Sequence, residues 1–489
     1  MVGFVLKACV RRGAGAVWLA LTFSVIVPQL GHTQILPPYS VINNVPNPLA
    51  LPGQDLTQQK MGQSINVFCP TVHSIAMTPA ATPGQIDLDH LCSSMLGNSF
   101  RLDVNGLNGA LSQLNGGAEL GVPTGQASIV QTTQTSRQTS AIEARLSQLR
   151  DWPTDTAVAG GGFPRTGQIA ALNTEDPTGQ ILLAQNQAPE FTYSSGLFGV
   201  WANGFGQFGS KDPTTSVNGY SFNNAGFVAG ADYRFTPQLV AGLAFGYSQS
   251  NTNFDTSAVS APGQFLSGNL FQGNIYATYS VTDALYLSGI GLVGGGNNNS
   301  QRHIVIPSNN PASTPPIDSV AVGNFGSQIQ GVTVAGGYAL PFGPLIVTPI
   351  LRFLYQHTGV DAMTENGALG ADLAFGSSSV NSVLTFLGAD AQYTMSTPFG
   401  PLYPIGRFHW AHQYSPGNTA VSVAYSNDPT SISSFILPGT PTSRNYFDLG
   451  VGLGLQLSGN SSAFINYDAI LGITNTTYNS FTAGVRFSF

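Results

Sequence analysis

The last nine residues of the sequence, FTAGVRFSF at positions 481–489, alternate between two kinds of side chain. Successive side chains of a β-strand point to opposite faces, so this stretch predicts a strand with two chemically different faces. The apolar face would consist of Phe481, Ala483, Val485, Phe487 and Phe489. The other face would consist of the small or polar residues Thr482, Gly484, Arg486 and Ser488.

The same alternation recurs from about Gly196 onward. Clear examples are FVAGADYRF (227–235), LVAGLAFGYSQS (239–250) and FQGNIYATYS (271–280). Strands of outer-membrane barrels alternate in this way, with apolar residues toward lipid and polar or small residues toward the lumen. Each segment is also long enough to cross a bilayer, which takes about 9 to 11 tilted residues.

Connection lengths separate a barrel from a soluble β-sandwich, whose strands would also alternate. Short turns are expected at 236–237, 281–283, 341–344, 397–400 and 458–460. Longer polar loops are expected at 209–223, 251–264, 297–324, 358–382 and 415–444, with a shorter one near 474–478. Short and long connections alternate as in outer-membrane barrels. The sequence therefore predicts an all-β membrane protein, an antiparallel transmembrane β-barrel of about twelve strands over residues 196–489, whose last strand pairs with its first.

The composition agrees with a membrane protein. Only 8 % of the residues are Asp, Glu, Lys or Arg, whereas an average soluble domain has roughly 25 %. The 58 glycines and the 10 % of aromatic residues favour extended, closely packed backbone. A formal net charge of −7 provides no basic surface for nucleic acid.

Residues 1–33 are interpreted as a signal peptide. Lys7, Arg11 and Arg12 precede the apolar run AVWLALTFSVIV (16–27), a charged region followed by an apolar one. This run is shorter than the roughly 20 residues that a transmembrane helix needs. An uncleaved membrane anchor is the alternative interpretation.

Residues 34–124 form a short segment ahead of the barrel. Helices are expected from about Asp55 to Cys69 and from Asp87 to Leu96. In an oxidising compartment Cys69 and Cys92 would form a disulfide between these helices, whereas in a reduced protein they would be free thiols. A unit this small is expected to have little core of its own, so a disulfide would be important for its stability.

Residues 125–151 are predicted to form an amphipathic helix that could plug the barrel. Ile142, Leu146 and Leu149 recur at helical spacing among mostly polar residues. One helix over this range would be about 37 Å long, enough to thread a membrane barrel. The candidates for lumen contacts are Arg137, Glu143, Arg145 and Leu146. The alternatives are a coiled-coil-like or periplasmic helix, or a barrel plugged by residues 152–195 instead, which are expected to be a flexible linker.

A family resemblance covers about Gly196 to Phe489. It is carried by GLFGVWANGFGQFGS (196–210), NNAGFVAGADYRFTPQLVAGLAFGYSQSNTNF (223–254), TENGA (364–368) and the closing VRFSF (485–489), in that order. Together these stretches resemble the β-domain of autotransporters, the proteins of type V secretion. The resemblance implies a barrel in the bacterial outer membrane, in contact with its lipid and with loops at the cell surface, that is plugged by a helix joining an outside segment to the first strand.

The resemblance also implies partners and a role for the last strand. In the family, a terminal aromatic strand is the signal read by the barrel-assembly machinery, and periplasmic chaperones deliver the chain. The residues that would carry this signal are Phe481, Val485, Phe487 and Phe489. Autocleaving members cut near an Asn pair in the threading helix. The predicted helix has no Asn, so an uncleaved protein is expected.

Motifs for catalysis, metals or cofactors are weak or missing in the sequence. No G-x-S-x-G element occurs, and Gly97-Asn98-Ser99-Phe100 only loosely matches a lipase block. His409 and His412 would point to opposite faces of a strand, and His303 and His357 are expected in or beside long loops. The G-x-G-x-x-G match at 289–294 lies in a predicted strand, where the glycines are better explained by close packing. We therefore expect neither an enzyme nor a cofactor.

Three functions remain open at this stage. The first is a monomeric autotransporter-type barrel that inserts itself and anchors or displays its N-terminal segment at the cell surface. The second is an adhesin that contacts an extracellular or host ligand through the long loops 301–324 and 416–443. The third is a narrow diffusion pore.

Overall fold

The computed structural model describes residues 49–51, 54, 56–98, 104–115, 138–146, 197–213, 219–255, 263–307, 316–398, 400–415, 420–429, 432–437, 443–457 and 461–488. The predicted signal peptide 1–33, the predicted linker 152–195 and Phe489 lie outside these ranges. Within them, no helix has both the length and the apolar character that crossing a bilayer requires.

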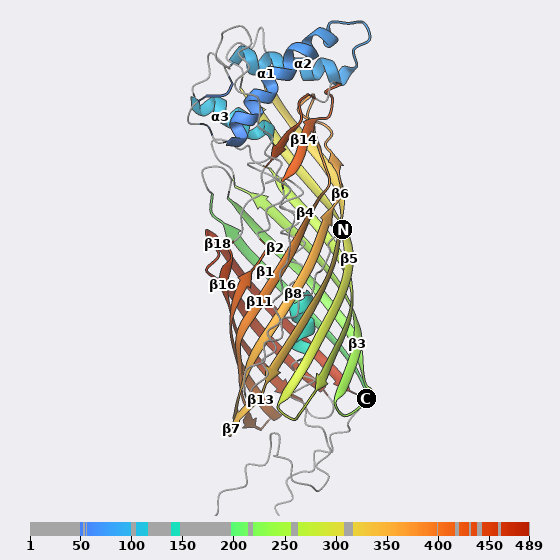
Figure 1. Cartoon of the computed structure of the whole chain (residues 1–489), viewed down its shortest axis with the longest axis vertical. Helices are drawn as coiled ribbons and strands as arrows, with labels where there is room; N and C mark the ends of the chain where they lie inside the picture. The colour runs from blue at the N-terminus through green and yellow to red at the C-terminus, as the bar shows by residue number, and fades with distance from the viewer. Residues whose placement is uncertain are drawn as a thin grey trace, which may run out of the picture. The chain divides into compact units, whose positions relative to one another are not determined.

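Twelve long antiparallel strands form one closed barrel (Figure 1). They are β1 (Phe198–Lys211), β2 (Tyr220–Arg234), β3 (Leu239–Phe254), β4 (Phe265–Ser280), β5 (Leu285–Ile306), β6 (Ile317–Tyr338), β8 (Leu345–Val360), β11 (Ser378–Tyr393), β13 (Gly400–Gln413), β16 (Asn445–Gln456), β17 (Ser461–Leu471) and β18 (Thr476–Ser488). Two three-residue strands, β7 (Leu340–Phe342) and β12 (Met395–Thr397), follow β6 and β11 along the chain and pair with β8 and β13 next to the turns.

The barrel closes because the first strand pairs with the last. Their register runs without interruption from Gly199 opposite Ser488 to Lys211 opposite Thr476. No long strand is therefore left with an unpaired edge, as a spanning sheet requires. The prediction of a twelve-stranded antiparallel barrel whose last strand pairs with its first is confirmed.

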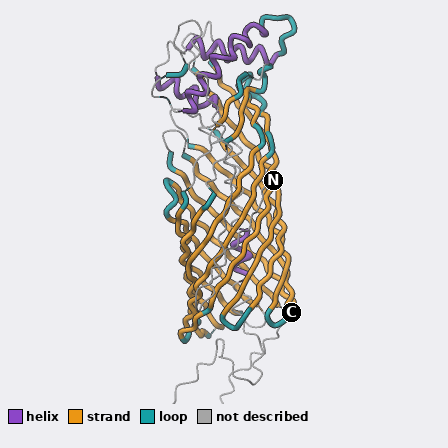
Figure 2. Tube along the Cα trace, viewed as in Figure 1, coloured by secondary structure: helices purple, strands orange, loops and turns teal. Residues whose placement is uncertain are grey.

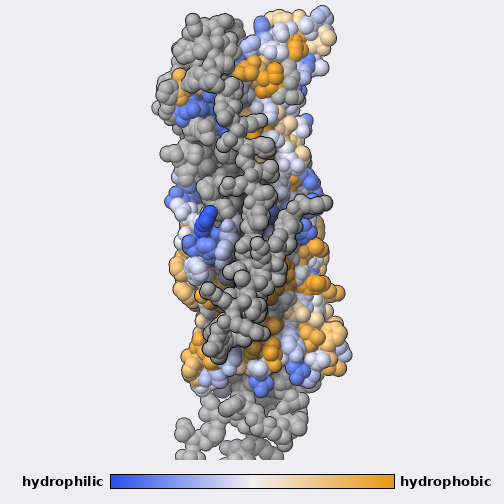
Figure 3. Space-filling model, viewed as in Figure 1, coloured by the Kyte–Doolittle hydropathy of each residue, from blue (hydrophilic) through white to orange (hydrophobic). Residues whose placement is uncertain are grey.

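Apolar side chains cover the outside of the barrel. Exposed Leu243, Ile275, Leu351 and Val451 face outward from β3, β4, β8 and β16. Aromatic residues border this band, and rings on neighbouring strands contact one another, as Phe245 and Phe271 do at 6.3 Å. On the face drawn in Figure 3, hydrophobic residues gather around the lower part of the barrel. This distribution is the lipid-facing band with aromatic girdles that membrane barrels show.

The short turns at 236–237, 281–283 and 341–344 lie where the sequence predicted them, whereas residues 399 and 458–460 of the other two lie outside the described residues. Three predicted loops are wrong. Strands β5 and β6 each have 22 residues and stay paired up to Ile306 opposite Ile317, so most of 297–324 is strand. This part of the hairpin extends beyond the apolar band, where its outward residues can be polar. The predicted loops 358–382 and 415–444 contain a second sheet, in the order β15 (Phe435–Leu437), β14 (Val421–Tyr425), β10 (Leu373–Phe375), β9 (Met363–Thr364).

The N-terminal segment forms three helices, α1 (Leu56–Ala76), α2 (Pro83–Asn98) and α3 (Val104–Asn115). The first two are the predicted helices: α1 continues about two turns beyond Cys69, and α2 begins one turn before Asp87. Helix α2 begins with a capping box, because Thr82 Oγ1 accepts from the Gln85 N–H and Gln85 Oε1 accepts from the Thr82 N–H. Sequence reasoning did not predict α3, whose short polar sequence contains Gly106 and Gly109.

Residues 138–146 are helical as well, and we call them the lumen helix. Strands surround this helix in Figure 2. The rest of the predicted helical range 125–151 lies outside the described residues.

We expect an arginine at the middle of the lipid-facing band to destabilise the barrel. Ile275 is 62 % exposed on the outward face of β4, and Ile275→Arg should lower the free energy of unfolding in lipid vesicles by about 2–4 kcal/mol. Asn299→Arg, on the outward face of β5 beyond the band, is the matched control and should cost less than about 1 kcal/mol. Equal losses from the two variants, measured by urea titration, would contradict the assigned position of the bilayer.

Candidate functional site

The lumen helix packs against one side of the barrel interior. Its Ala141, Ile142 and Leu146 share a buried cluster with inward-facing residues of the first five strands. Those wall residues are Trp201, Phe205, Val228, Val240, Ala244, Tyr276 and Ile290. The helix therefore presents its apolar stripe to β1–β5.

A buried ion pair fixes the lumen helix to β2. Arg145 donates from Nη2 and Nε to the two carboxylate oxygens of Asp232, at 2.6 and 2.7 Å. Arg145 is fully buried and Asp232 nearly so. Asp232 Oδ2 also accepts a hydrogen bond from the Tyr276 hydroxyl, which in turn accepts one from Trp201 Nε1. Removing either ionic partner would leave the other charge buried and unpaired, which is costly.

Glycine at position 199 makes room for this ion pair. A Cβ there would lie 2.8 Å from Asp232 Oδ1 and 2.9 Å from Arg145 Nη2. Real Cβ atoms do not approach other atoms so closely. The wall of β1 is thus shaped to admit the guanidinium group.

Further polar contacts hold the helix on both sides. Gln138 donates to Ser248, and Asn203 Nδ2 donates to the Ala141 carbonyl at 2.9 Å. On the opposite side Glu143 pairs with Arg352 of β8. The lumen helix is therefore anchored to strands on two sides of the barrel.

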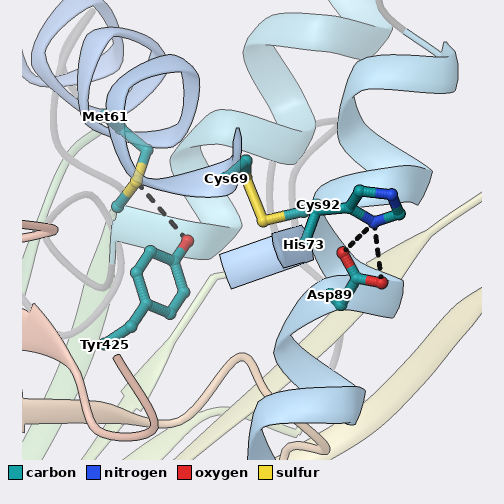
Figure 4. Close-up of a disulfide and its surroundings, with 6 residues drawn as sticks. All are labelled: Met61, Cys69, His73, Asp89, Cys92 and Tyr425. Carbon is teal, nitrogen blue, oxygen red and sulfur yellow. Dashed lines mark hydrogen bonds and ion pairs between the residues drawn. A yellow bond between two sulfur atoms is a disulfide. The ribbon is translucent and has the colours of Figure 1, made fainter. Parts of the chain in front are cut away.

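The three N-terminal helices form a unit that we call the cap. Figure 4 shows its disulfide, which joins Cys69 of α1 to Cys92 of α2 with a Cα–Cα distance of 5.5 Å. Closing a loop of this length should stabilise the cap by about 3 kcal/mol in the chain-entropy description. In the same view His73 lies against Asp89, with 3.0 Å between Nδ1 and Oδ1.

The cap does not have a core of its own. One buried cluster contains Phe68 and Leu111 of the cap together with Leu373, Val423 and Leu437 of the second sheet. The segment was expected to have little core of its own, and residues from the barrel's own extensions complete the cluster.

Tyr425 is the central contact between the cap and the second sheet. Its ring lies 5.0 Å from the Phe68 ring, and its hydroxyl reaches Met61 Sδ at 3.5 Å. Burial raises the pKa of the Tyr425 hydroxyl above its ordinary value, so this group stays protonated. Nearby, Ser64 Oγ donates to the Ser433 carbonyl at 2.9 Å.

A second buried arginine ties the cap to β5. Arg302 Nη2 and Nε donate to the two carboxylate oxygens of Glu365, and both side chains are almost completely buried. The remaining nitrogen, Nη1, donates to the Gln113 carbonyl in the last turn of α3 at 2.7 Å. Carbonyls in this turn lack a partner within the helix, so the guanidinium group caps α3. Arg302 thus joins a barrel strand, an outer connection and the cap.

Besides the disulfide of the cap, the predicted site residues lie in two places. Phe481, Val485 and Phe487 point outward from β18 and are about half exposed. Glu143, Arg145 and Leu146 belong to the lumen helix and make the contacts given above. Phe489 and Arg137 lie outside the described residues. The assembly-signal role of β18 stays a prediction.

The histidines that sequence analysis considered each contact a polar side chain. His303 and His357, expected in or beside long loops, lie near the outer ends of β5 and β8, and they pair with Asp318 and Asn381. His409 points inward to Asp390, whereas His412 points outward, as the spacing predicted. The described ranges contain no group of three potential metal-binding side chains.

Sequence reasoning missed Asp232, Arg302 and Glu365. A usable signal was present, because inward-facing charged residues are rare in a chain with so few charges. Such a residue on a strand needs a buried partner, and its partner here comes from a distant segment. The pairing itself could not be read from the sequence.

Replacing one partner of the ion pair between Arg145 and Asp232 should destabilise the barrel more than replacing both partners. Arg145→Met leaves Asp232 buried without its partner and should cost about 3–5 kcal/mol in chemical denaturation. The double variant Arg145→Met/Asp232→Asn should recover part of this loss. Equal stability of the wild type and both variants would show that the pair does not hold the helix.

Arg302 should be required for cap docking. Arg302→Met leaves Glu365 unpaired and should weaken docking by about 3–5 kcal/mol, which limited proteolysis would detect as faster cleavage within α1–α3. The control is Asp318→Asn, which breaks the exposed contact with His303 and should leave the cleavage rate unchanged. Identical cleavage of both variants would contradict the role of Arg302.

The geometry can be compared with known proteins. The family described as Autotransporter beta-domain matches residues 200–468. The chain is similar in structure to the translocator domain of the autotransporter NalP from Neisseria meningitidis, with 13 % identity, a TM-score of 0.47, and coverage of 61 % of this chain and 90 % of that one. It is also similar to the β-domain of the Bordetella autotransporter BrkA, with 15 % identity, a TM-score of 0.43, and coverage of 60 % and 100 %.

A third similar structure is the transport unit of AIDA-I from Escherichia coli, with 17 % identity, a TM-score of 0.39, and coverage of 63 % of this chain and 94 % of that one. The comparison with curated proteins finds no match. The family match alone spans more than half of the sequence and lies within the closed barrel. This chain belongs to the autotransporter β-domain family.

Proposed function

We propose that this protein is an outer-membrane autotransporter whose passenger is the cap, and that the barrel keeps this passenger docked at the cell surface. Family membership puts the barrel in the bacterial outer membrane. The observation that carries the proposal of docking is the core that the cap shares with the second sheet.

The topology supports a surface position for the cap. β1 begins and β18 ends at the side of the short turns, which faces the periplasm in outer-membrane barrels. The cap contacts the opposite end: Ser64 bonds to Ser433 just ahead of β15, the backbone at Asp87 lies beside Gly370, and Gln113 bonds to Arg302 of β5. This end would be outside the cell.

The chain order supports threading through the barrel. The cap precedes the lumen helix, and the lumen helix precedes β1, which starts at the periplasmic side. A chain that begins outside and enters β1 from the periplasm must cross the membrane, and residues 138–146 lie inside the barrel. The lumen helix is then the link that anchors the cap and obstructs the lumen.

We further propose that the cap remains attached and performs no catalysis. Residues 138–146 contain no Asn, whereas the resemblance places autocleavage at an Asn pair. The His73–Asp89 contact is the nearest approach to a catalytic dyad in the cap, and His73 is largely exposed to solvent. Assembly would depend on the barrel-assembly machinery and periplasmic chaperones, as in the family.

Adhesion is a second candidate function, located on the cap and its surroundings instead of long loops. Leu369 is 64 % exposed and has a φ of 48°, a conformation that non-glycine residues rarely adopt. It is flanked by the fully buried Ala368 and by Gly370, whose φ is also positive. A rigid connection that presents an apolar side chain is suited to contact with another protein.

The decisive experiment is surface labelling of an epitope inserted at Pro79, in the turn between α1 and α2. We expect antibody to reach it in intact cells, and the full-length protein to remain in the membrane fraction. A tag at Asp283, in a short turn, should be reached only after permeabilisation, and a tag near Ser313 should be reached in both conditions.

Other outcomes separate the alternatives. If the Pro79 tag is accessible only in permeabilised cells, the cap is periplasmic and the proposal is wrong. If the tagged segment appears in the medium, the passenger is released rather than held. If antibody reaches the tag in intact cells, and Leu369→Ser abolishes binding to host matrix, the adhesin is favoured.

A further inference from the structure

An aromatic pair marks the outer border of the apolar band on β3 and β4. Tyr247 and Phe271 lie opposite each other and their ring centroids are 4.9 Å apart. Between them and the short turns, the exposed side chains of the same strands are apolar, as Leu243 and Ile275 are. Aromatic girdles lie at the level of the lipid headgroups. The hydrocarbon therefore ends near this pair of rings.

Beyond the border, three neighbouring strands present neutral amides on the outside of the barrel. Gln249 of β3 lies opposite Asn269 of β4, and Ser267 of β4 lies opposite both Asn251 and Asn299. The polar residues are thus continuous across β3, β4 and β5. We use the name amide surface for the outward-facing Gln249, Asn251, Asn253, Asn269, Asn297 and Asn299.

The amide surface is free of charge. Residues 249–253, 265–269 and 297–301 contain no Asp, Glu, Lys, Arg or His. Phosphate groups are recognised mainly through Arg and Lys, so this surface is poorly suited to the phosphate of a phospholipid. An amide side chain both donates and accepts hydrogen bonds, as a hydroxyl group does. The chemistry therefore matches the hydroxyl groups of an uncharged sugar.

Several of these amides are available to a ligand. Gln249, Asn253 and Asn299 are exposed, and their side chains make no hydrogen bond to any residue that the structure describes. Asn251 Nδ2 has one long contact, 3.4 Å to Asn223 Oδ1 on β2. The donors and acceptors of the surface are therefore largely unused by the protein.

The middle of the surface is held in a fixed arrangement. Asn269 Oδ1 accepts a hydrogen bond from the Asn297 backbone N–H at 2.8 Å. The register between β4 and β5 is interrupted at this point, and a Cβ on Gly296 would lie only 1.7 Å from the Asn269 carbonyl oxygen. Glycine thus allows the two backbones to approach, and the approach orients the Asn269 amide before any ligand binds.

Height above the border distinguishes between kinds of lipid. Two strand residues cover about 7 Å, which at the tilt of membrane barrels is about 5 Å of height. Gln249, Asn251 and Asn253 therefore stand roughly 5, 10 and 15 Å above Tyr247. The polar layer of a phospholipid leaflet is only about 5–8 Å thick. A headgroup that reaches the upper amides must be larger than that of a phospholipid.

We propose that the amide surface binds the sugar headgroup of an uncharged glycolipid whose acyl chains lie along the apolar band below it. Sugar hydroxyls donate to the amide oxygens and accept from the amide N–H groups, while the chains contact Leu243 and Ile275. Continuity with the lipid-facing band favours a lipid over a dissolved glycan, because membrane anchoring raises the local concentration of the headgroup.

This site lies on the barrel wall and does not involve the cap. It is therefore independent of the proposed function, and it is retained if the cap is released or periplasmic. Failure of either proposal can be recognised without reference to the other.

The test uses the full chain in nanodiscs of phosphatidylcholine that contain a minor fraction of a second lipid with matched acyl chains. This second lipid is either digalactosyldiacylglycerol, which has an uncharged sugar headgroup, or the anionic phosphatidylglycerol. Lipids that stay bound after mild detergent extraction are quantified by mass spectrometry. We expect the digalactosyl lipid to be enriched at least about fivefold over phosphatidylcholine, and phosphatidylglycerol not to be enriched. Equal retention of the three lipids, or enrichment of phosphatidylglycerol, would overturn the proposal.

Variants locate the binding surface. Asn251→Ala/Asn299→Ala removes two of the amides and should lower the enrichment at least about threefold. The matched control is Asn381→Ala, which removes an exposed amide from β11, on the far side of the barrel, and should leave the enrichment unchanged. Folding is checked by electrophoretic mobility before and after heating, and Gln249→Ala replaces the double variant if that variant does not fold. Unchanged enrichment in the folded variant refutes the proposal.

A competition experiment separates the lipid from a dissolved glycan. The free disaccharide of the digalactosyl headgroup, added in millimolar excess, should leave the bound lipid in place because it lacks the membrane anchor. Displacement by the free disaccharide would assign the amide surface to dissolved glycans and would contradict the proposed lipid.

Discussion

A strand inside hydrocarbon must have all of its backbone N–H and C=O groups bonded, and the pairing of β1 with β18 meets that requirement for the whole sheet. Closure has a second consequence, because it creates an interior whose residues face one another instead of lipid. The interior can therefore hold charged pairs such as Arg145 and Asp232 that would be too costly on the outer face. The lumen helix depends on closure for each of its contacts.

Because the chain has few charged residues, its few buried ion pairs have a large effect on how distant segments are positioned. The whole chain has 16 basic and 23 acidic side chains. The two fully buried arginines are each placed where distant segments meet: Arg145 joins the lumen helix to β2, and Arg302 joins β5 to α3. Each guanidinium group binds its carboxylate with two nitrogens, which fixes orientation as well as distance. The same type of contact therefore positions both the plug and the cap.

Much of the barrel could be predicted from the sequence because lipid imposes a strict two-residue period on each strand. The alternation of Leu243, Phe245 and Tyr247 can be recognised in the sequence of one strand, without knowing which strands pair with it. That period fades beyond the bilayer, where both faces of a strand may be polar, so residues 297–324 resembled a loop although they continue β5 and β6. The second sheet was missed for a related reason, since its strands have only two to five residues.

The candidate site was less predictable. Periodicity identified the lumen helix, but its partners come from β2 and β8, and no local pattern links Arg145 to Asp232 or Glu143 to Arg352. The sequence also did not predict the shared core, because its residues come from the helices and from two outer connections, which meet only in the folded structure.

The long hairpin of β5 and β6 also supports the cap above the membrane surface. A bilayer takes up about 9 to 11 residues of a strand, so roughly half of each 22-residue strand stands above it. Adding two residues to both strands would preserve which side chains face inward. It would lengthen the part of the hairpin above the bilayer by about 6 Å. The height at which the cap stands over the lipid headgroups is thus set by strand length alone, and it could vary between relatives without any change in the barrel or in the cap.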